Sequence, residues 1–198
     1  ICKIMDKSKI QDYLDKQINF IKSLNESSEK INQIYNNLLN ARNSKNNIFL
    51  MGNGGSASTA SHFTADLLKT SIVENENRFS AFSLTDNIPV ILAWANDDGY
   101  DNIFLGQLKN LVKQGDIVIG ISGSGNSKNV IKAFEYANQL NSITISFTGG
   151  NGGELAKLSK YNLNINDDDM LTIETGHLLI CHLLTTLIRS NGKPLFEY

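Results

Sequence analysis

Short apolar runs that end in small or polar residues, with helical spacing in the stretches between them, constrain the fold more than any other feature. Five such runs occur: NIFLMG (47–52), FSAFSL (79–84), DIVIGI (116–121), SITISF (142–147) and YNLNI (161–165). This alternation predicts a parallel β-sheet joined by crossover helices. Such sheets bind ligands beyond the carboxyl ends of their strands, where loops meet helix N-termini. Candidate functional residues are therefore sought in the loops after the runs.

The two ends of the chain carry helical patterns of different kinds. Near the N-terminus, apolar residues recur at helical spacing: Ile10, Leu14, Ile18, Ile21 and Leu24, then Ile31, Ile34, Leu38 and Ala41. They predict two amphipathic helices, with Ser27, Ser28 and Glu29 as a cap between them. We expect an antiparallel hairpin over about 6–44 that packs on the main body or on another subunit. The segment 171–188 is apolar nearly all round, which is typical of a buried helix.

Size and composition narrow the class of protein. The 198 residues are 41% hydrophobic and 19% charged, which fits one globular domain over 1–198 with its α/β core from about 45 to 198. The formal net charge of −2 argues against nucleic acid as a partner. No apolar run reaches the roughly 20 residues that cross a bilayer, and the N-terminal residues do not resemble a signal peptide, so no membrane partner is expected. The two cysteines form no paired motif, which favours a reducing cytoplasm.

The first glycine-rich segment, GNGGSA at 52–57, follows the first run and opens a helix. It formally matches the dinucleotide fingerprint G-x-G-x-x-A, but the acidic residue about 20 positions on is missing, because Asp86 lies too far along the chain. The glycines would let a ligand approach the backbone, and Asn53 and Ser56 can bind hydroxyl groups. The alternative is a tight strand-to-helix turn without a ligand.

The second such segment, SGSGNS at 122–127, predicts an anion site. The hydroxyls of Ser122, Ser124 and Ser127 converge with backbone N–H groups at a helix N-terminus, where the helix dipole favours negative charge. The lysine of the P-loop pattern is absent, which disfavours a nucleoside triphosphate with magnesium. A phosphate monoester is the preferred ligand, although Ser127 is also suited to cap the helix.

All three histidines fall on predicted helices near carboxylates. His62 and Asp66 are four residues apart and share one helix face. Glu174 and His182 interrupt the apolar surface of the last helix, where a charged group without a partner is costly to bury. His177, taken alone, is interpreted as a core histidine.

Together, His62, Asp66, Glu174 and His182 suit either zinc binding or proton transfer. The eight residues from Glu174 to His182 span about 12 Å of helix. Either Glu174 therefore lies at a helix entrance, or the two residues serve different sites across a subunit interface.

Several segments together resemble the bacterial phosphoheptose isomerases, SIS-domain enzymes that act on sedoheptulose 7-phosphate. They are GNGGSASTASHFTADL (52–67), AWANDDGYDNIF (93–104), ISGSGNSKNVIKA (121–133), FTGGNGGELAKLSKYNLNI (147–165) and TIETGHLLICHLLTTLI (172–188). The resemblance covers almost the whole chain. It implies a three-layer α/β sandwich of flavodoxin-like type with a five-stranded parallel sheet, preceded by the helical pair. It also implies a homotetramer whose active sites lie between subunits.

The resemblance assigns roles to individual residues. The sugar would contact Asn53, Gly54, Gly55, Ser56, Asn96 and Asp97, and the phosphate would contact Ser122, Gly123, Ser124 and Ser127. His62, Asp66, Glu174 and His182 stand at the zinc-binding and catalytic positions, with one zinc per subunit, and Asp66 and Glu174 also border the substrate. The implied reaction is an aldose–ketose isomerisation that yields D-glycero-D-manno-heptose 7-phosphate through an enediol. Asp66 and His182 are the expected acid/base pair, and the product would serve lipopolysaccharide, capsule or another glycan.

A few positions depart from the family pattern. Asp66 replaces a Glu and Glu174 replaces a Gln, so a carboxylate is shortened on one helix and added on another. Thr70 replaces an Arg, and Gly123 replaces the Thr of the phosphate loop. We interpret the first two changes as a compensating pair that preserves isomerase chemistry. The added carboxylate would also suit manganese or another harder cation.

Other functions remain open at this point. Similar SIS proteins are tetrameric scaffolds that bind a replication initiator and lack the acid and the second histidine, whereas this chain keeps His62, Asp66 and His182. An acid and imidazoles kept in near-apolar surroundings favour the enzyme. A phosphosugar-sensing module would use the serine loop without turnover. An isomerase of hexose phosphates would share the loop, but such chains are usually larger or differently arranged.

Overall fold

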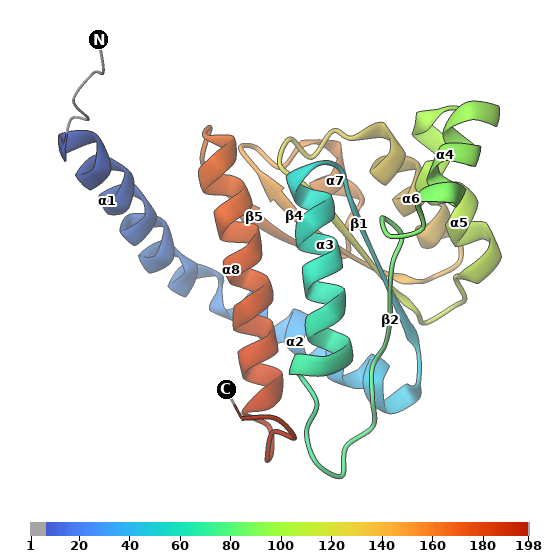
Figure 1. Ribbon diagram of the computed structural model, residues 1–198, viewed down its shortest axis with the longest axis horizontal. Coiled ribbons are helices and arrows are strands. Elements are labelled where there is room, and N and C mark those ends of the chain that lie inside the picture. The colour runs from blue at the N-terminus through green and yellow to red at the C-terminus, as the bar shows by residue number, and fades with distance from the viewer. Residues whose placement is uncertain (1–6, 198) are drawn as a thin grey trace.

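A computed structural model describes residues 7–197 and contains the predicted five-stranded parallel sheet (Figure 1). The strand order is β2-β1-β3-β4-β5, and every neighbouring pair is parallel. The strands are β1 (Asn47–Gly52), β2 (Ser80–Ser83), β3 (Ile117–Ser122), β4 (Ile143–Gly149) and β5 (Tyr161–Ile165). All five begin and end within two residues of the predicted runs. The strands β1, β3 and β4 are almost entirely buried, whereas the edge strands β2 and β5 are partly exposed.

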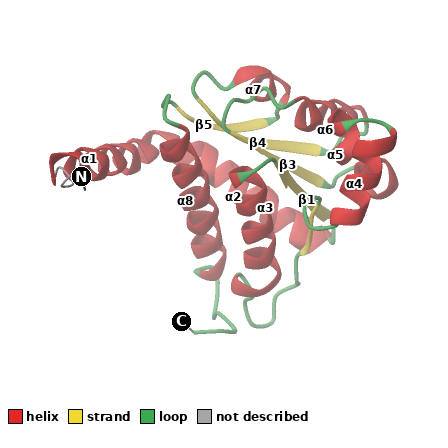
Figure 2. Ribbon diagram, turned by 45° about the horizontal axis from the view of Figure 1, so that its top comes forward, coloured by secondary structure: helices red, strands yellow, loops and turns green. Residues whose placement is uncertain are grey.

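Helices cover both faces of the sheet, which confirms the three-layer α/β architecture (Figure 2). One layer contains α2 (Ser28–Ser44), α3 (Gly55–Ala65) and α8 (Met170–Arg189). The other contains α4 (Ile88–Asp97), α5 (Ile103–Leu111), α6 (Lys128–Gln139) and α7 (Gly153–Leu158). Side chains of β1 alternate between the layers, so Ile48 and Leu50 pack with the first group of helices and Phe49 and Met51 with the second. The sheet therefore has an apolar core on each side.

The N-terminal helical pair differs from the predicted hairpin. The helices α1 (Lys7–Ser23) and α2 form as expected, but α1 points away from the body instead of folding back along α2 (Figure 1). The connection is a 3₁₀ turn, η1 (Leu24–Ser27), which bends the helical path without reversing it. Apolar residues on α1 are consequently between 44% and 50% exposed: Ile10, Tyr13, Leu14, Ile18 and Ile21.

The last helix, α8, lies in the core layer as its composition predicts. It is long and apolar enough to pass a length-and-composition test for a membrane span. Half of the tested window is buried inside the protein, and α8 packs against α2, α3, β4 and β5. These contacts identify α8 as a core helix of the sandwich, and they place one of its faces beside α3 (Figure 1).

His177 on α8 is the core histidine that the sequence predicts. Its side chain is fully buried, and its Nε2 lies 3.1 Å from the carbonyl oxygen of Thr148. Among the described residues, its Nδ1 has no hydrogen-bond partner. Burial lowers the pKa of His177 from 6.5 to about 4, so the folded protein holds the neutral imidazole above that pH.

Acid should therefore weaken the fold through His177. Its folded pKa lies below its unfolded value, so between pH 6.5 and about 4 the unfolded chain binds the extra proton. Lowering the pH across that interval should decrease the free energy of unfolding by roughly 3 kcal/mol through His177, at 1.36 kcal/mol per pH unit. Urea unfolding at pH 7, 5.5 and 4.5, compared between the wild type and His177→Gln, measures the difference. Parallel pH profiles for the two proteins would contradict it.

Candidate active site

The two glycine-rich loops meet at the carboxyl edge of the sheet. One follows β1 and leads into α3, and the other follows β3 and leads into α6. Together they line a pocket of about 320 Å³ with these residues: Asn53, Gly54, Gly55, Ser56, Ile121, Ser122, Gly123, Ser124, Ser127, Met170 and Glu174. The structure thus brings together most of the residues that the sequence assigned to sugar and phosphate binding.

The serine-rich loop has the hydroxyls and the helix N-terminus expected of an anion site. The hydroxyl of Ser122 lies 3.0 Å from that of Ser127, which is the N-cap residue of α6 but makes no capping hydrogen bond with its side chain. The loop closes through a bond from the Gly125 N–H to the Ser122 carbonyl, 3.0 Å long. The Ser127 hydroxyl is therefore directed to the pocket wall instead of the helix end, at a terminus whose dipole favours negative charge.

Gly125 is the position in this loop that requires glycine. Its φ is +65°, and a Cβ there would collide with the carbonyl of Gly152. We expect Gly125→Ala to lower the free energy of unfolding by about 2 kcal/mol or more, because a strained φ is added to a backbone clash. Phosphate binding should weaken at the same time. Calorimetry of inorganic phosphate binding and thermal unfolding measure the two effects. A variant with wild-type values in both would contradict this role.

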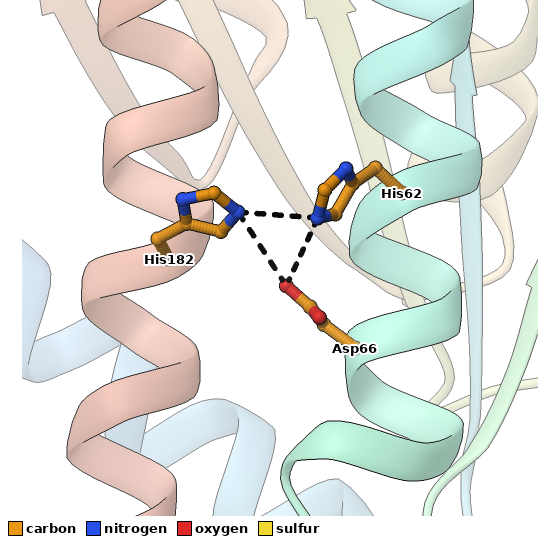
Figure 3. Close-up of side chains that lie close together, drawn as sticks. All are labelled: His62, Asp66 and His182. Carbon is orange, nitrogen blue, oxygen red and sulfur yellow. Dashed lines mark hydrogen bonds and ion pairs between the residues drawn. The ribbon is translucent and has the colours of Figure 1, made fainter. Parts of the chain in front are cut away.

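Three side chains from two neighbouring helices form a tight cluster on the α3–α8 face (Figure 3). His62 from α3 and His182 from α8 place their Nε2 atoms 3.1 Å apart. The Asp66 Oδ2 atom lies 3.7 Å from the His62 Nε2 and 4.0 Å from the His182 Nε2. Asp66 is 8% exposed, whereas both imidazoles are about half exposed, so solvent or a ligand reaches this cluster from the histidine side.

A local change of helix type positions Asp66. The residue begins a π-helical turn, η2 (Asp66–Thr70), in which the Ser71 N–H donates to the Asp66 carbonyl at 2.8 Å. Such wide turns often occur at functional sites, because they redirect the side chains of a helix. The Thr185 hydroxyl of α8 donates to the Cys181 carbonyl at 2.9 Å and lies 3.5 Å from the Asp66 Oδ2, which places a polar group of the opposite helix beside the carboxylate.

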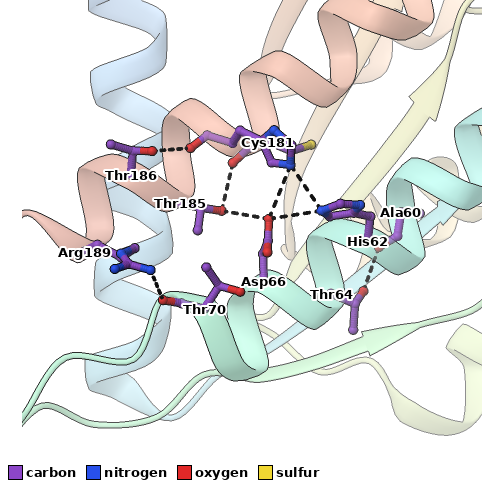
Figure 4. Close-up of polar contacts among 10 residues, drawn as sticks. Ala60, His62, Thr64, Asp66, Thr70, Cys181, Thr185, Thr186 and Arg189 are labelled. Carbon is purple, nitrogen blue, oxygen red and sulfur yellow. Dashed lines mark hydrogen bonds and ion pairs between the residues drawn. The ribbon is translucent and has the colours of Figure 1, made fainter. Parts of the chain in front are cut away.

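Polar groups continue below the cluster in a pocket of about 260 Å³ (Figure 4). The pocket is lined by Asp66, Thr70, His182, Thr185, Thr186 and Arg189. The Arg189 guanidinium donates to the carbonyl of Thr70 at 3.5 Å and to the carbonyl of Phe196 at 2.9 Å. A guanidinium from α8 thus lies next to Thr70, the position where the family pattern has an arginine. No sequence pattern marks Arg189 as part of this pocket, because only the packing of α8 on α3 brings it beside Thr70.

Glu174 lies at the other end of the same helix face. Its carboxylate abuts the start of α3 so closely that a Cβ at Gly55 would collide with it. A negative charge is favourable at a helix N-terminus. Glu174 lines the loop pocket, while the cluster that could hold a metal comprises His62, Asp66 and His182. A role for Glu174 as a further ligand stays a prediction.

Asn96 and Asp97 are not part of the loop pocket. They lie on the exposed last turn of α4, where the Asn96 side chain donates to the Asp97 carboxylate at 2.7 Å. Asp97 lines a separate hollow with Ala93, Trp94 and Asp98. Their contact with the sugar stays a prediction, and an assembly of subunits could bring them to a substrate.

Comparison with known proteins identifies the family. The SIS domain model matches residues 12–149. A phosphoheptose isomerase from Helicobacter pylori is 40% identical over 167 residues, which are 84% of this chain and 86% of that protein. The structures of phosphoheptose isomerases from Neisseria gonorrhoeae and Francisella tularensis superpose with TM-scores of 0.86 and 0.87 at 29% identity. They cover 93% and 94% of this chain and 98% and 100% of their own. The chain therefore belongs to the SIS domain family and, within it, to the phosphoheptose isomerases.

Proposed function

We propose that the chain interconverts sedoheptulose 7-phosphate and D-glycero-D-manno-heptose 7-phosphate. The observation that carries the proposal is the arrangement of two unlike sites along α3 and α8. An anion loop and Glu174 lie at one end, and the cluster of His62, Asp66 and His182 lies farther along the same helices. A sugar with its phosphate in the loop would extend along this face, with its carbonyl end toward the cluster.

In the proposed reaction, the residues of the cluster move the protons. Asp66 takes a proton from C1 of the ketose, beside the carbonyl, and the electron pair of that C–H bond forms the enediol. The proton then returns to C2, which gives the aldose. His182 exchanges a proton between the two substrate oxygens, since its imidazole is half exposed and lies within 4.0 Å of the Asp66 carboxylate.

The same three residues fit a zinc ion. Two imidazole nitrogens and one carboxylate oxygen are ligand types that zinc prefers, and these atoms lie within 4.8 Å of one another. We propose that His62, Asp66 and His182 hold one zinc per subunit. A zinc ion bound there would polarise the substrate carbonyl as a Lewis acid. Asp66 would then share its carboxylate between the metal and the proton, and His182 would exchange its proton through Nδ1, because zinc would take the lone pair of Nε2.

We further propose a homotetramer in the cytoplasm whose product serves lipopolysaccharide or capsule synthesis. The exposed apolar face of α1 supports assembly, because a free α1 would leave Ile10, Leu14 and Ile18 in water. Assembly would also give Asn96 and Asp97 a neighbouring subunit's substrate to contact. The absence of a paired cysteine motif fits a reducing compartment. The described Cys181 is a buried free cysteine, and Cys2 lies outside the described residues.

Turnover tests the proposal against a scaffold or a sensor. Purified protein with zinc is incubated with sedoheptulose 7-phosphate, and formation of the aldose is followed. The proposal predicts aldose formation that depends on enzyme concentration. A protein that binds the sugar phosphate without turnover would instead be a phosphosugar-binding module. Turnover of a hexose phosphate in place of the heptose would keep the chemistry and overturn the substrate.

A further inference from the structure

Asn129, the second residue of α6, connects the two glycine-rich loops that line the pocket. It is 2% exposed and does not line the pocket. Its side-chain amide pairs reciprocally with that of Asn53 in the first glycine-rich loop. The Asn53 Nδ2 donates to the Asn129 Oδ1 at 3.0 Å, and the Asn129 Nδ2 donates to the Asn53 Oδ1 at 2.9 Å. A buried residue of the phosphate-loop helix thus holds a pocket residue of the other loop.

A backbone group fixes the orientation of both amides. The N–H of Val130, which can only donate, is shared between the Ser127 carbonyl and the Asn129 Oδ1, each 3.0 Å away, and so identifies the Oδ1 as the acceptor. The Asn129 Nδ2 must then be the donor that faces Asn53, and the Asn53 Oδ1 must accept from it. If one amide were turned over, two donors or two acceptors would face each other in this partly buried pair. If both were turned over, the Asn129 Nδ2 would face the Val130 N–H, so two donors would meet there.

Tyr100 completes the set from a third segment. Its hydroxyl donates to the Asn53 Oδ1 at 2.9 Å. Tyr100 begins the 3₁₀ turn η3 (Tyr100–Asn102), which is tied to α6 because Lys132 donates to the side chain of Asn102 at 3.0 Å. The ring of Tyr100 is more than half exposed, so the hydroxyl reaches Asn53 from the rim of the site.

Counting donors and acceptors shows what Asn53 has left for a ligand. Its Oδ1 has two lone pairs, and both receive donors, one from Asn129 and one from Tyr100. Its amide nitrogen has two hydrogens, and one is given to Asn129. One N–H remains, so Asn53 can offer a ligand a donor and no acceptor.

We propose that Asn129 and Tyr100 are positioning residues that make Asn53 a dedicated N–H donor to a substrate oxygen. This inference rests on the proposed function for the identity of the substrate, but the hydrogen-bond arrangement does not depend on it. The arrangement selects a ligand with an oxygen acceptor next to the free Asn53 N–H. It also fixes the first glycine-rich loop relative to the serine-rich loop. Neither residue touches the ligand; both act through Asn53.

A double-mutant cycle tests this inference. Asn129→Asp keeps the size of the side chain and the acceptor for Val130, but it removes the donor to Asn53. We expect kcat/KM for sedoheptulose 7-phosphate to fall about tenfold or more, and Tyr100→Phe to lower it about threefold, as expected for lost hydrogen bonds. In an Asn53→Ala background, neither change should lower kcat/KM further. Tyr136→Phe, which removes a hydroxyl from α6 at a residue that does not line the pocket, serves as the matched control.

The cycle separates positioning from general damage to the fold. Losses that add fully in the Asn53→Ala background would overturn the inference, because they would not pass through Asn53. The Kd for inorganic phosphate, measured by calorimetry, should stay within about twofold in Tyr100→Phe.

If the wild type shows no turnover, the same cycle is run on the Kd of sedoheptulose 7-phosphate. Non-additive losses of affinity there would support the positioning role although the isomerase proposal had failed. Additive losses, or no losses, would overturn the positioning role itself.

Discussion

Replacing Asp66 with Asn is expected to lower kcat for the isomerisation by about 10²- to 10⁴-fold, the usual contribution of a positioned acid or base. The amide has the size of the carboxylate and can keep the contact with Thr185, but it cannot take a proton from carbon. Asp66 is the only carboxylate in the cluster of three, so no neighbouring acid within it replaces the function. Steady-state kinetics with sedoheptulose 7-phosphate, together with the Kd of inorganic phosphate, separate this loss from a loss of binding.

Two further variants sharpen this prediction. Glu135→Gln makes the same carboxylate-to-amide change on the exposed side of α6 and should retain wild-type kinetics. Asp66→Glu restores the residue of the family pattern and should keep most of the activity if Asp66 and Glu174 are a compensating pair. An Asp66→Asn protein that turned over at the wild-type rate would remove Asp66 from the mechanism.

Removing the proposed zinc is expected to have the second largest effect. Dialysis against a chelator should lower kcat/KM by about 10²-fold or more, and added zinc should restore it, because the Lewis acid contributes several kcal/mol to the transition state. His62→Ala should show the same loss without chelator, since it removes one of three ligands. Metal analysis of the purified protein should find about one ion per chain in the wild type and much less in the variant.

A readout other than activity makes the metal prediction independent of the reaction. Zinc at about 100 times its Kd should raise the free energy of unfolding by about 3 kcal/mol in the wild type. The His62→Ala variant should show little of this stabilisation. Metal-free wild type that works at full rate, and whose unfolding zinc does not change, would contradict a metal at the cluster.

The sequence could predict the sheet because its signals are local. The central strands β1, β3 and β4 are apolar runs that end in turn residues, so each run marks its buried strand, and β2 and β5 follow the same spacing at the edges of the sheet. The relation of α1 to α2 could not be predicted in the same way. Helical spacing reports which face of a helix is apolar, but the turn at Leu24–Ser27 sets the direction of the chain, and no glycine or proline there indicates a reversal.

The same distinction between local sequence signals and tertiary packing applies to the candidate site. The two glycine-rich loops and the pair His62 and Asp66 are contiguous in sequence, and the structure finds each group together. Helix rise alone predicts that Glu174 and His182 lie too far apart to share one metal comfortably. The structure places the two residues at opposite ends of the α3–α8 face. The π-helical turn at Asp66, the placement of Arg189 beside Thr70 and the buried Asn129 depend on tertiary packing.

Deuterium entry from solvent tests the central claim most directly. Wild-type protein is incubated with sedoheptulose 7-phosphate and zinc in heavy water, and NMR follows the carbons next to the carbonyl. We predict aldose that carries deuterium at C2, with the label lost in Asp66→Asn and retained in Glu135→Gln. Neither aldose nor deuterium in a protein that still binds the phosphate would contradict the proposal that the Asp66 cluster transfers protons.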